Sequence, residues 1–89
     1  MDFSYFCNAT NWSSKPYNEI LNDVREISQY LDEQNTWNTI WFSEHHLQTT
    51  QGGEMECIPN PILLSADIAA RTKNIRIGQA ASIATFWNP

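Results

Sequence analysis

A strand that ends in a carboxylate and two imidazoles constrains the fold of this chain more than any other feature. Residues 39–46 read Thr-Ile-Trp-Phe-Ser-Glu-His-His, and their apolar part is hydrophobic on both faces, as in a strand covered on both sides. An Ala-rich helix follows, and residues 75–83 then predict another strand with the same direction. Titratable residues at the carboxyl end of a parallel strand are where α/β enzymes place their chemistry.

The first part of the chain predicts one more strand and a helix. Residues 2–7 alternate polar and apolar side chains, which favours a strand. In the helix that follows, Ser13 or Ser14 is the expected N-cap, and Pro16 is expected in the first turn. Apolar residues recur there at steps of three and four, along one stripe: Tyr17, Ile20, Leu21, Val24, Ile27 and Leu31. Residues 34–38 are the expected turn before the next strand, residues 39–44.

The second helix is expected over residues 62–71, with Asn60 as its N-cap and Pro61 at its first position. The order is therefore β-α-β-α-β, with crossovers long enough for parallel strands and right-handed connections. Parallel strands bring their carboxyl ends to one rim. The residues expected at that rim are Cys7, Asn8, Glu44, His45, His46 and residues 80–84.

Composition excludes several classes of function. The chain has 89 residues, one small domain at most, and a formal net charge of −5. Its one basic grouping is Arg71, Lys73 and Arg76, so binding to nucleic acid or to an anionic membrane is not expected. The apolar runs are too short for a membrane span. The two cysteines form no CxxC pair and no secretory signal pattern precedes them, so a cytoplasmic location is expected.

Alternation along the strand at residues 39–46 separates its two titratable side chains. One face receives Trp41, Ser43 and His45, and the other receives Ile40, Phe42 and Glu44. Glu44 and His45 therefore do not enter one pocket from a regular strand. One of them is expected to be the reactive group and the other its hydrogen-bonding or ionic support. A structural histidine is the alternative interpretation.

A metal site is the rival interpretation of the same residues. Glu44, His45, His46 and Cys57 include side chains that bind zinc. Adjacent histidines on a strand point apart, however, and the helical HExxH spacing does not occur. No metal is therefore expected.

Small residues interrupt the strand expected at residues 75–83. Residues 78–82 read Gly-Gln-Ala-Ala-Ser within an otherwise β-branched segment. Such a run fits a tightly packed barrel interior, and it equally fits a place where a flat ligand lies against the backbone. Composition leaves both interpretations open.

Taken together, these motifs resemble the N-terminal segment of the bacterial luciferase-like flavin monooxygenases. The matching segments, in order, are residues 40–46, 60–61, 70–73, 75–81 and 88–89. They extend over nearly the whole chain. The resemblance implies that residues 1–89 are the N-terminal fragment of a TIM (β/α)8 barrel, incomplete in this chain because such a barrel takes roughly 250 residues.

The resemblance also implies a chemistry. Family members use reduced flavin mononucleotide (FMN), or in some branches the deazaflavin F420, to oxidise or reduce a small organic substrate. His45 matches the catalytically important histidine of bacterial luciferase. Ala80 and Ala81 match two alanines joined by a non-proline cis peptide bond under the flavin ring, and Ser43 is expected with them as a cofactor-binding residue. The expected function is a flavin-dependent monooxygenase, with molecular oxygen and a small molecule as its partners.

Two alternatives stay open. One is an F420-dependent oxidoreductase of the same barrel family, and the other is a non-catalytic module that self-associates through open sheet edges. In an incomplete barrel, Phe3, Trp41 and Ile77 are expected to be exposed to water. The chain is therefore expected to form homo-oligomers or to self-associate through its open sheet edges. The loop after His46 departs from the family pattern, so the resemblance does not identify the substrate. In a TIM barrel the phosphate site comes from the loops after strands 7 and 8, so the residues expected to hold the flavin phosphate are not among these three strands and two helices.

Overall fold

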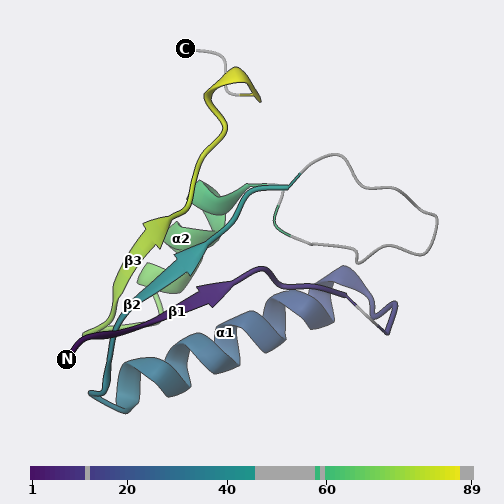
Figure 1. The fold of residues 1–89 in the computed structure, drawn as a ribbon. Helices are drawn as coiled ribbons and strands as arrows, with labels where there is room; N and C mark the ends of the chain where they lie inside the picture. Colours follow the sequence, from purple (N-terminus) through teal and green to yellow (C-terminus); the bar gives the residue numbers. More distant parts are fainter. Residues whose placement is uncertain (12, 46–57, 59, 87–89) are drawn as a thin grey trace.

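Three parallel strands and two helices alternate along the chain in the computed structural model, which describes residues 1–11, 13–45, 58 and 60–86 (Figure 1). The elements are β1 (Phe3–Cys7), α1 (Tyr17–Glu33), β2 (Trp37–Phe42), α2 (Pro61–Ala69), β3 (Arg76–Gln79) and a short 3-10 helix, η1 (Ala84–Phe86). The sheet order is β1-β2-β3, and β2 pairs in parallel with both neighbours. This confirms the predicted β-α-β-α-β order.

The register of the sheet divides its side chains between two faces. Tyr5, Ile40 and Ile77 form one row across the three strands, and Phe6, Trp41 and Gly78 form the next row on the opposite face. Side chains from both helices pack on the face of Ile40, because α1 and α2 contribute to the same buried cluster. That cluster consists of Cys7, Val24, Leu31, Ile40, Phe42, Ile58, Leu64, Ile68 and Ile75. Burying each large apolar side chain contributes about 1.5–3 kcal/mol, so this face holds the sheet and helices together.

The opposite face of the sheet is open. On this face Phe6 is 52% exposed and Trp41 is 38% exposed. Phe3 is 46% exposed as well, but it lies before the register irregularity of β1, where its ring contacts Trp37. The expected exposure of Phe3 and Trp41 is confirmed. The same expectation for Ile77 is wrong, because Ile77 lies beside Ile40 in the register and packs against the buried cluster.

The two helices begin in different ways. At α2, the Asn60 side chain accepts a hydrogen bond from the Leu63 backbone N–H at 3.0 Å, which confirms the predicted cap. The serine cap predicted for α1 is wrong. Pro16 occupies the N-cap position with an extended ψ of 144° and no side-chain cap, so the helix begins two or three residues later than a cap at Ser14 or Ser13 requires.

The loop before α1 explains why neither serine caps it. The Asn11 side chain accepts from the Lys15 N–H and donates to the Lys15 carbonyl oxygen, both at 2.9 Å. Ser14 has a φ of 54°, a left-handed conformation away from the helix. The Pro16 carbonyl oxygen then accepts from the Glu19 and Ile20 N–H groups.

An ionic contact joins the two helices. The Arg25 guanidinium donates to both carboxylate oxygens of Asp67, with Nε–Oδ2 at 2.7 Å and Nη2–Oδ1 at 3.2 Å. Arg71 donates to the same carboxylate at 3.2 Å. The hydrogen bond from Arg25 is the main reason that the pKa of Asp67 lies below its usual value. This bidentate pair therefore fixes α2 against α1 on the outer side of the sheet.

Asp32 is a carboxylate buried in the structure. It lies near the end of α1, and its oxygens accept from three successive backbone N–H groups: Lys73 at 3.0 Å, Asn74 at 2.7 Å and Ile75 at 2.7 Å. Burial raises the pKa of Asp32, but these three N–H groups and the Lys73 charge lower it more, so the net pKa lies below its usual value. Asp32 thus fixes the turn from α2 into β3 against the end of α1.

Among the described residues, no helix has both the length and the hydropathy needed to cross a membrane.

Candidate active site at the carboxyl ends of the strands

The carboxyl ends of the three strands lie together, as the parallel order predicts (Figure 1). Two backbone hydrogen bonds extend the sheet beyond the assigned strands: the Ser43 N–H donates to the Cys7 carbonyl at 3.4 Å, and the Ala80 N–H donates to the Phe42 carbonyl at 2.8 Å. These bonds bring the segments after β1, β2 and β3 into one edge. The edge carries the predicted site residues Ser43, His45, Ala80 and Ala81.

Glu44 and His45 leave β2 in different environments, as the alternation of the strand predicted. The Glu44 side chain is buried, whereas His45 is exposed. The backbone N–H of His45 donates to the Ile58 carbonyl oxygen at 3.1 Å, and Ile58 itself is buried. The imidazole is therefore accessible on a backbone that the segment before α2 holds in place. His46 and Cys57, the other residues of the possible metal set, lie outside the described residues.

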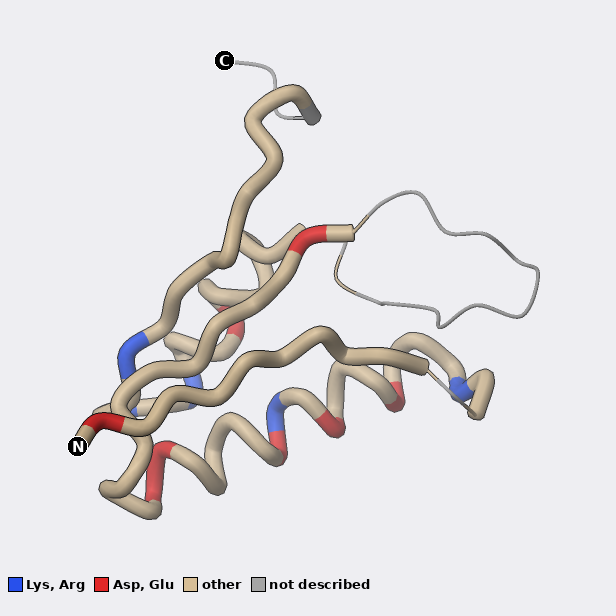
Figure 2. The backbone as a smooth tube through the Cα atoms, viewed as in Figure 1, with Lys and Arg blue, Asp and Glu red and all other residues tan. Residues whose placement is uncertain are grey.

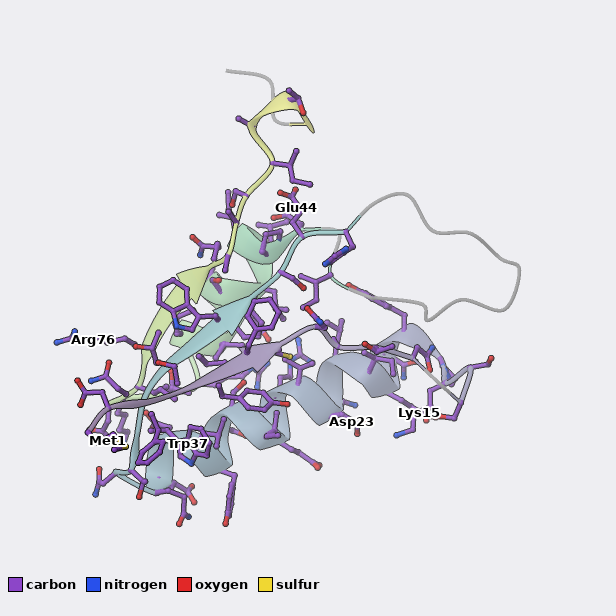
Figure 3. The ribbon with its side chains drawn as sticks, in the orientation of Figure 1. Met1, Lys15, Asp23, Trp37, Glu44 and Arg76 are labelled. Carbon is purple, nitrogen blue, oxygen red and sulfur yellow. The ribbon has the colours of Figure 1, made fainter. Side chains whose placement is uncertain are left out.

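Glu44 is a supporting residue at this edge. Its carboxylate accepts a hydrogen bond from the backbone N–H of Ile83. In Figure 3, Glu44 lies at the end of β2 beside the segment that follows β3. A second hydrogen bond lies at the end of β3, where the Gln79 side chain donates to the Ser65 hydroxyl group of α2 at 2.9 Å. The segment that contains Ala80 and Ala81 is thus held at both ends by side-chain hydrogen bonds.

The Ala80–Ala81 peptide bond is cis, the conformation that the resemblance implied for this pair. Both alanines are exposed. Ser43 is only 2% exposed, yet its Oγ has no hydrogen-bond partner among the described residues. The same is true, within that part of the chain, of the buried Oδ1 of Asn8, directly after β1. Sequence reasoning placed Asn8 at this rim but gave it no function; the one signal available was a polar residue immediately after a strand.

The structure explains why one residue of the small-residue run at 78–82, Gly78, has no side chain. A Cβ atom at this position would lie 2.4 Å from Cζ3 and 2.5 Å from Cε3 of Trp41. The indole of Trp41 therefore lies across the Gly78 backbone, on the open face of the sheet. At Gly78 the small residue is explained by packing against this ring. The exposed alanines two and three residues later are not covered in that way.

We expect Gly78→Ala to lower the free energy of unfolding by about 1–3 kcal/mol, because the added methyl group forces the Trp41 ring out of its position. Urea unfolding followed by circular dichroism measures the loss. Trp41→Leu is the matched background, since it removes the ring atoms that the methyl group meets. An equal loss in both backgrounds would show that the contact with Trp41 is not the cause.

The charges at this edge are sparse. In the described segments that follow the three strands, residues 8–11, 43–45 and 80–86, Glu44 is the one Asp, Glu, Lys or Arg residue (Figure 2). Lys15 lies further along the loop, where it pairs with Asp23 at 2.7 Å. Within the described part of the chain, no cluster of three or more His, Cys, Asp or Glu side chains is suited to a metal ion. These segments therefore offer neutral polar groups and small side chains to a ligand.

Comparison with known proteins identifies the family. The family model described as luciferase-like monooxygenase matches residues 1–89. The chain is 31% identical over 90 residues to the oxygenase component of a flavin-dependent trigonelline monooxygenase from Acinetobacter baylyi, covering 100% of this chain and 23% of that protein. It is 34% identical over 91 residues to the uncharacterized protein y4vJ from Sinorhizobium fredii, covering 100% of this chain and 24% of that protein. The chain thus spans about a quarter of the length of these curated relatives.

The three parallel strands and two helices agree with the N-terminal part of the TIM (β/α)8 barrel that this family adopts. The chain belongs to the luciferase-like monooxygenase family.

Proposed function

We propose that residues 1–89 form the N-terminal part of a cytoplasmic flavin-dependent monooxygenase that oxidises a small organic substrate with molecular oxygen. The family membership supports this function, as does the trigonelline monooxygenase relative, which is named as flavin-dependent. The observation that carries the proposal is the parallel pairing of β2 with β3, which brings the segment with the exposed His45 and the segment with the exposed Ala80 and Ala81 to the same edge of the sheet.

The residues at this edge fit a flat ring with a polar rim. Ala80 and Ala81 offer a surface without bulky side chains, and Ser43 offers a buried hydroxyl group that has no partner among the described residues. We propose FMN as the cofactor, with Ala80 and Ala81 supporting the ring and Ser43 in contact with it. When bound, a reduced flavin supplies the electrons with which molecular oxygen is activated.

His45 is the residue that we assign to proton transfer. The residue is exposed after the end of β2, and a positioned imidazole is the side chain that most often serves as a general acid or base. Glu44 is buried and accepts from the Ile83 N–H, so its proposed role is to hold the chain beside the ring. The division of roles follows the alternation of β2, which directs the two side chains to opposite faces.

The direct test uses the full-length protein of which this chain forms a part. Supplied with reduced FMN and candidate heterocyclic or aliphatic substrates, it is expected to consume oxygen and to form a hydroxylated product, measured by an oxygen electrode and mass spectrometry. A parallel titration with F420 tests the deazaflavin alternative. That alternative predicts that the protein binds F420 more tightly than FMN. Absence of binding to either cofactor would contradict the proposed function.

The non-catalytic alternative predicts that the 89-residue chain associates with itself. The open three-stranded sheet leads to the same expectation for the isolated chain. β1 and β3 each have one sheet neighbour in the described structure, and Phe6 and Trp41 are exposed on the open face. Each Å² of apolar area left in water loses about 25 cal/mol of stabilisation. Over several such side chains, the total loss is comparable to the free energy of unfolding of a small domain. We expect the isolated chain to self-associate or to be marginally folded and to bind FMN weakly. A stable monomer in analytical ultracentrifugation that binds FMN at micromolar concentration would contradict this.

A further inference from the structure

A cavity of about 430 Å³ lies between β1 and one side of α1. The residues of α1 that line it include Ile20, Asp23 and Ile27. Leu21 and Arg25, on the opposite side of the helix, line a separate cavity with α2. The first cavity therefore lies on the side of α1 that faces away from α2. We call this side, which carries Ile20, Asp23 and Ile27, the β1 flank.

β1 is the edge strand on this side of the fold. The sheet order is β1-β2-β3, so within the described residues β1 has a strand beside it on one edge only (Figure 1). Tyr5 and Cys7 of β1 line the same cavity as the β1 flank. The unpaired edge of β1 and the β1 flank of α1 therefore face the same side of the fold, and no described strand or helix lies beyond them.

An apolar stripe extends along the β1 flank beyond the cavity. Ile20, Ile27 and Tyr30 are spaced by seven and three positions, so they lie on one side of the helix. Ile20 is buried but is not a member of the cluster on the face of Ile40, and Tyr30 is 59% exposed. At 1.5 Å per residue, the stripe is about 15 Å long. That length fits a second helix better than a small ligand, which fills a single concave pocket.

Polar groups beside the stripe indicate the chemistry of the segment that covers it. Oδ1 of Asn8, which also lines the cavity, is buried and has no hydrogen-bond partner among the described residues. An amide oxygen accepts hydrogen bonds, so it requires an N–H or O–H donor. Glu19 and Glu26 border the stripe, whereas the one basic residue of α1, Arg25, donates to Asp67 on the other side of the helix. An apolar helix face with basic residues at its margin therefore matches the β1 flank.

The fold of the family specifies which segment reaches this flank. A TIM barrel closes because its last strand pairs with its first, and the helix after each strand lies in an outer ring. The free edge of β1 is therefore the place of the last strand, and the helix after that strand lies next to the β1 flank of α1. Because this chain spans about a quarter of the length of its curated relatives, that strand and helix belong to the rest of the full-length protein.

We propose that the β1 flank of α1 is the docking surface for the helix that follows the last strand of the barrel. A bulky apolar side chain of that helix enters the cavity between β1 and α1, and an N–H or O–H group beside it donates to Oδ1 of Asn8. Basic side chains at the margin of the same helix lie opposite Glu19 and Glu26. The cavity is thus a packing socket within the full-length protein and not a ligand site. This docking requires the barrel of the family but no particular cofactor.

Photo-crosslinking of the full-length protein identifies what covers the flank. Tyr30 is replaced by p-benzoylphenylalanine, whose benzophenone group inserts into a neighbouring C–H bond on irradiation. We expect a cross-link within one chain, from residue 30 to the helix after the last strand, located by mass spectrometry of the peptides. The same replacement at Gln29, an exposed residue on another side of α1, is the matched control and is expected to form no cross-link to that helix.

Every other outcome at residue 30 overturns the proposal. A cross-link to a second copy, seen as a product of twice the mass, would show that the flank is an interface between copies. A cross-link to another segment of the same chain would assign the surface to that segment, and the absence of any cross-link would show that the flank faces solvent. None of these outcomes bears on the proposed function, which the FMN titration tests separately.

Two substitutions in the full-length protein test the socket itself. Ile27→Trp is expected to lower the urea midpoint by about 0.5–1 M, because a filled cavity has no room for the added atoms, whereas the exposed Gln29→Trp leaves the midpoint unchanged. Asn8→Ala is also expected to lower the midpoint, and Asn8→Asp, which keeps an acceptor, is expected to lower it less. An unchanged midpoint in Ile27→Trp or in Asn8→Ala would show that the cavity is open in the full-length protein and would overturn the socket.

Discussion

His45→Ala in the full-length protein is expected to lower kcat by about 10²–10⁴-fold, the range that a positioned proton-transfer group contributes. The imidazole is exposed at the end of β2, and its backbone is held by the hydrogen bond to the Ile58 carbonyl, which the substitution leaves in place. The loss is therefore expected in turnover, with a small effect on folding. Steady-state oxygen consumption with saturating reduced FMN measures it.

Two controls separate catalysis from folding. Urea unfolding of the same variant is expected to agree with wild type within about 0.5 kcal/mol, the usual range for an exposed substitution. Thr85→Ala, an exposed residue in η1, is expected to leave turnover unchanged. His46→Ala is expected to alter packing or substrate fit. Equal turnover in His45→Ala and wild type would refute the catalytic role.

Local signals in the sequence predicted the order of elements well. The Asn60 cap is an interaction between residues three apart, and it forms as expected. The α1 cap failed because another local contact, between Asn11 and Lys15, shapes the preceding loop. The sequence prediction placed Ile77 on the open face. The alternation within one strand does not show which of its two faces packs against the helices. Its register with Ile40 is a property of the assembled sheet.

At the candidate site, too, the features set within one strand were predicted, and those that depend on contacts between strands were not. Alternation along one strand was enough to separate Glu44 from His45, and parallel order was enough to bring the segment of Glu44 and His45 to the same edge as residues 80–84. The sequence did not reveal that the Trp41 ring covers Gly78, since that contact joins two strands 37 positions apart. It also did not reveal that Asn8 and Ser43 lack partners, because hydrogen bonding depends on every neighbouring chain segment.

Asp32→Ala is expected to lower the free energy of unfolding by about 3–5 kcal/mol, which is the range for breaking a buried charged network. The substitution leaves three backbone N–H groups in the turn before β3 without their acceptor. This position lies at the opposite end of the sheet from His45, so the main effect is on stability. Urea unfolding of the full-length protein measures the change, with the exposed neighbour Glu33→Ala as the matched control.

Asp32→Asn divides the loss between the two carboxylate oxygens. Asn74 and Ile75 both donate to Oδ1, whereas Lys73 donates to Oδ2. An asparagine keeps the first acceptor and places an N–H₂ group at the second, so an intermediate loss is expected. If Asp32→Asn were as destabilising as Asp32→Ala, the two retained bonds at Oδ1 would contribute nothing, and charge alone would explain the effect.

The dependence on pH follows from the lowered pKa of Asp32. A carboxyl group whose pKa is lower in the folded protein stabilises the fold at pH values above its unfolded pKa of about 3.9. That contribution is lost as the pH falls through the folded pKa, because protonation removes an acceptor from the three N–H groups. The wild-type protein is therefore expected to lose stability more steeply below about pH 4 than Asp32→Asn, which has no proton to bind there. Parallel acid-unfolding curves for the two proteins would contradict this, because they would mean that the carboxylate is not held ionised by the turn into β3.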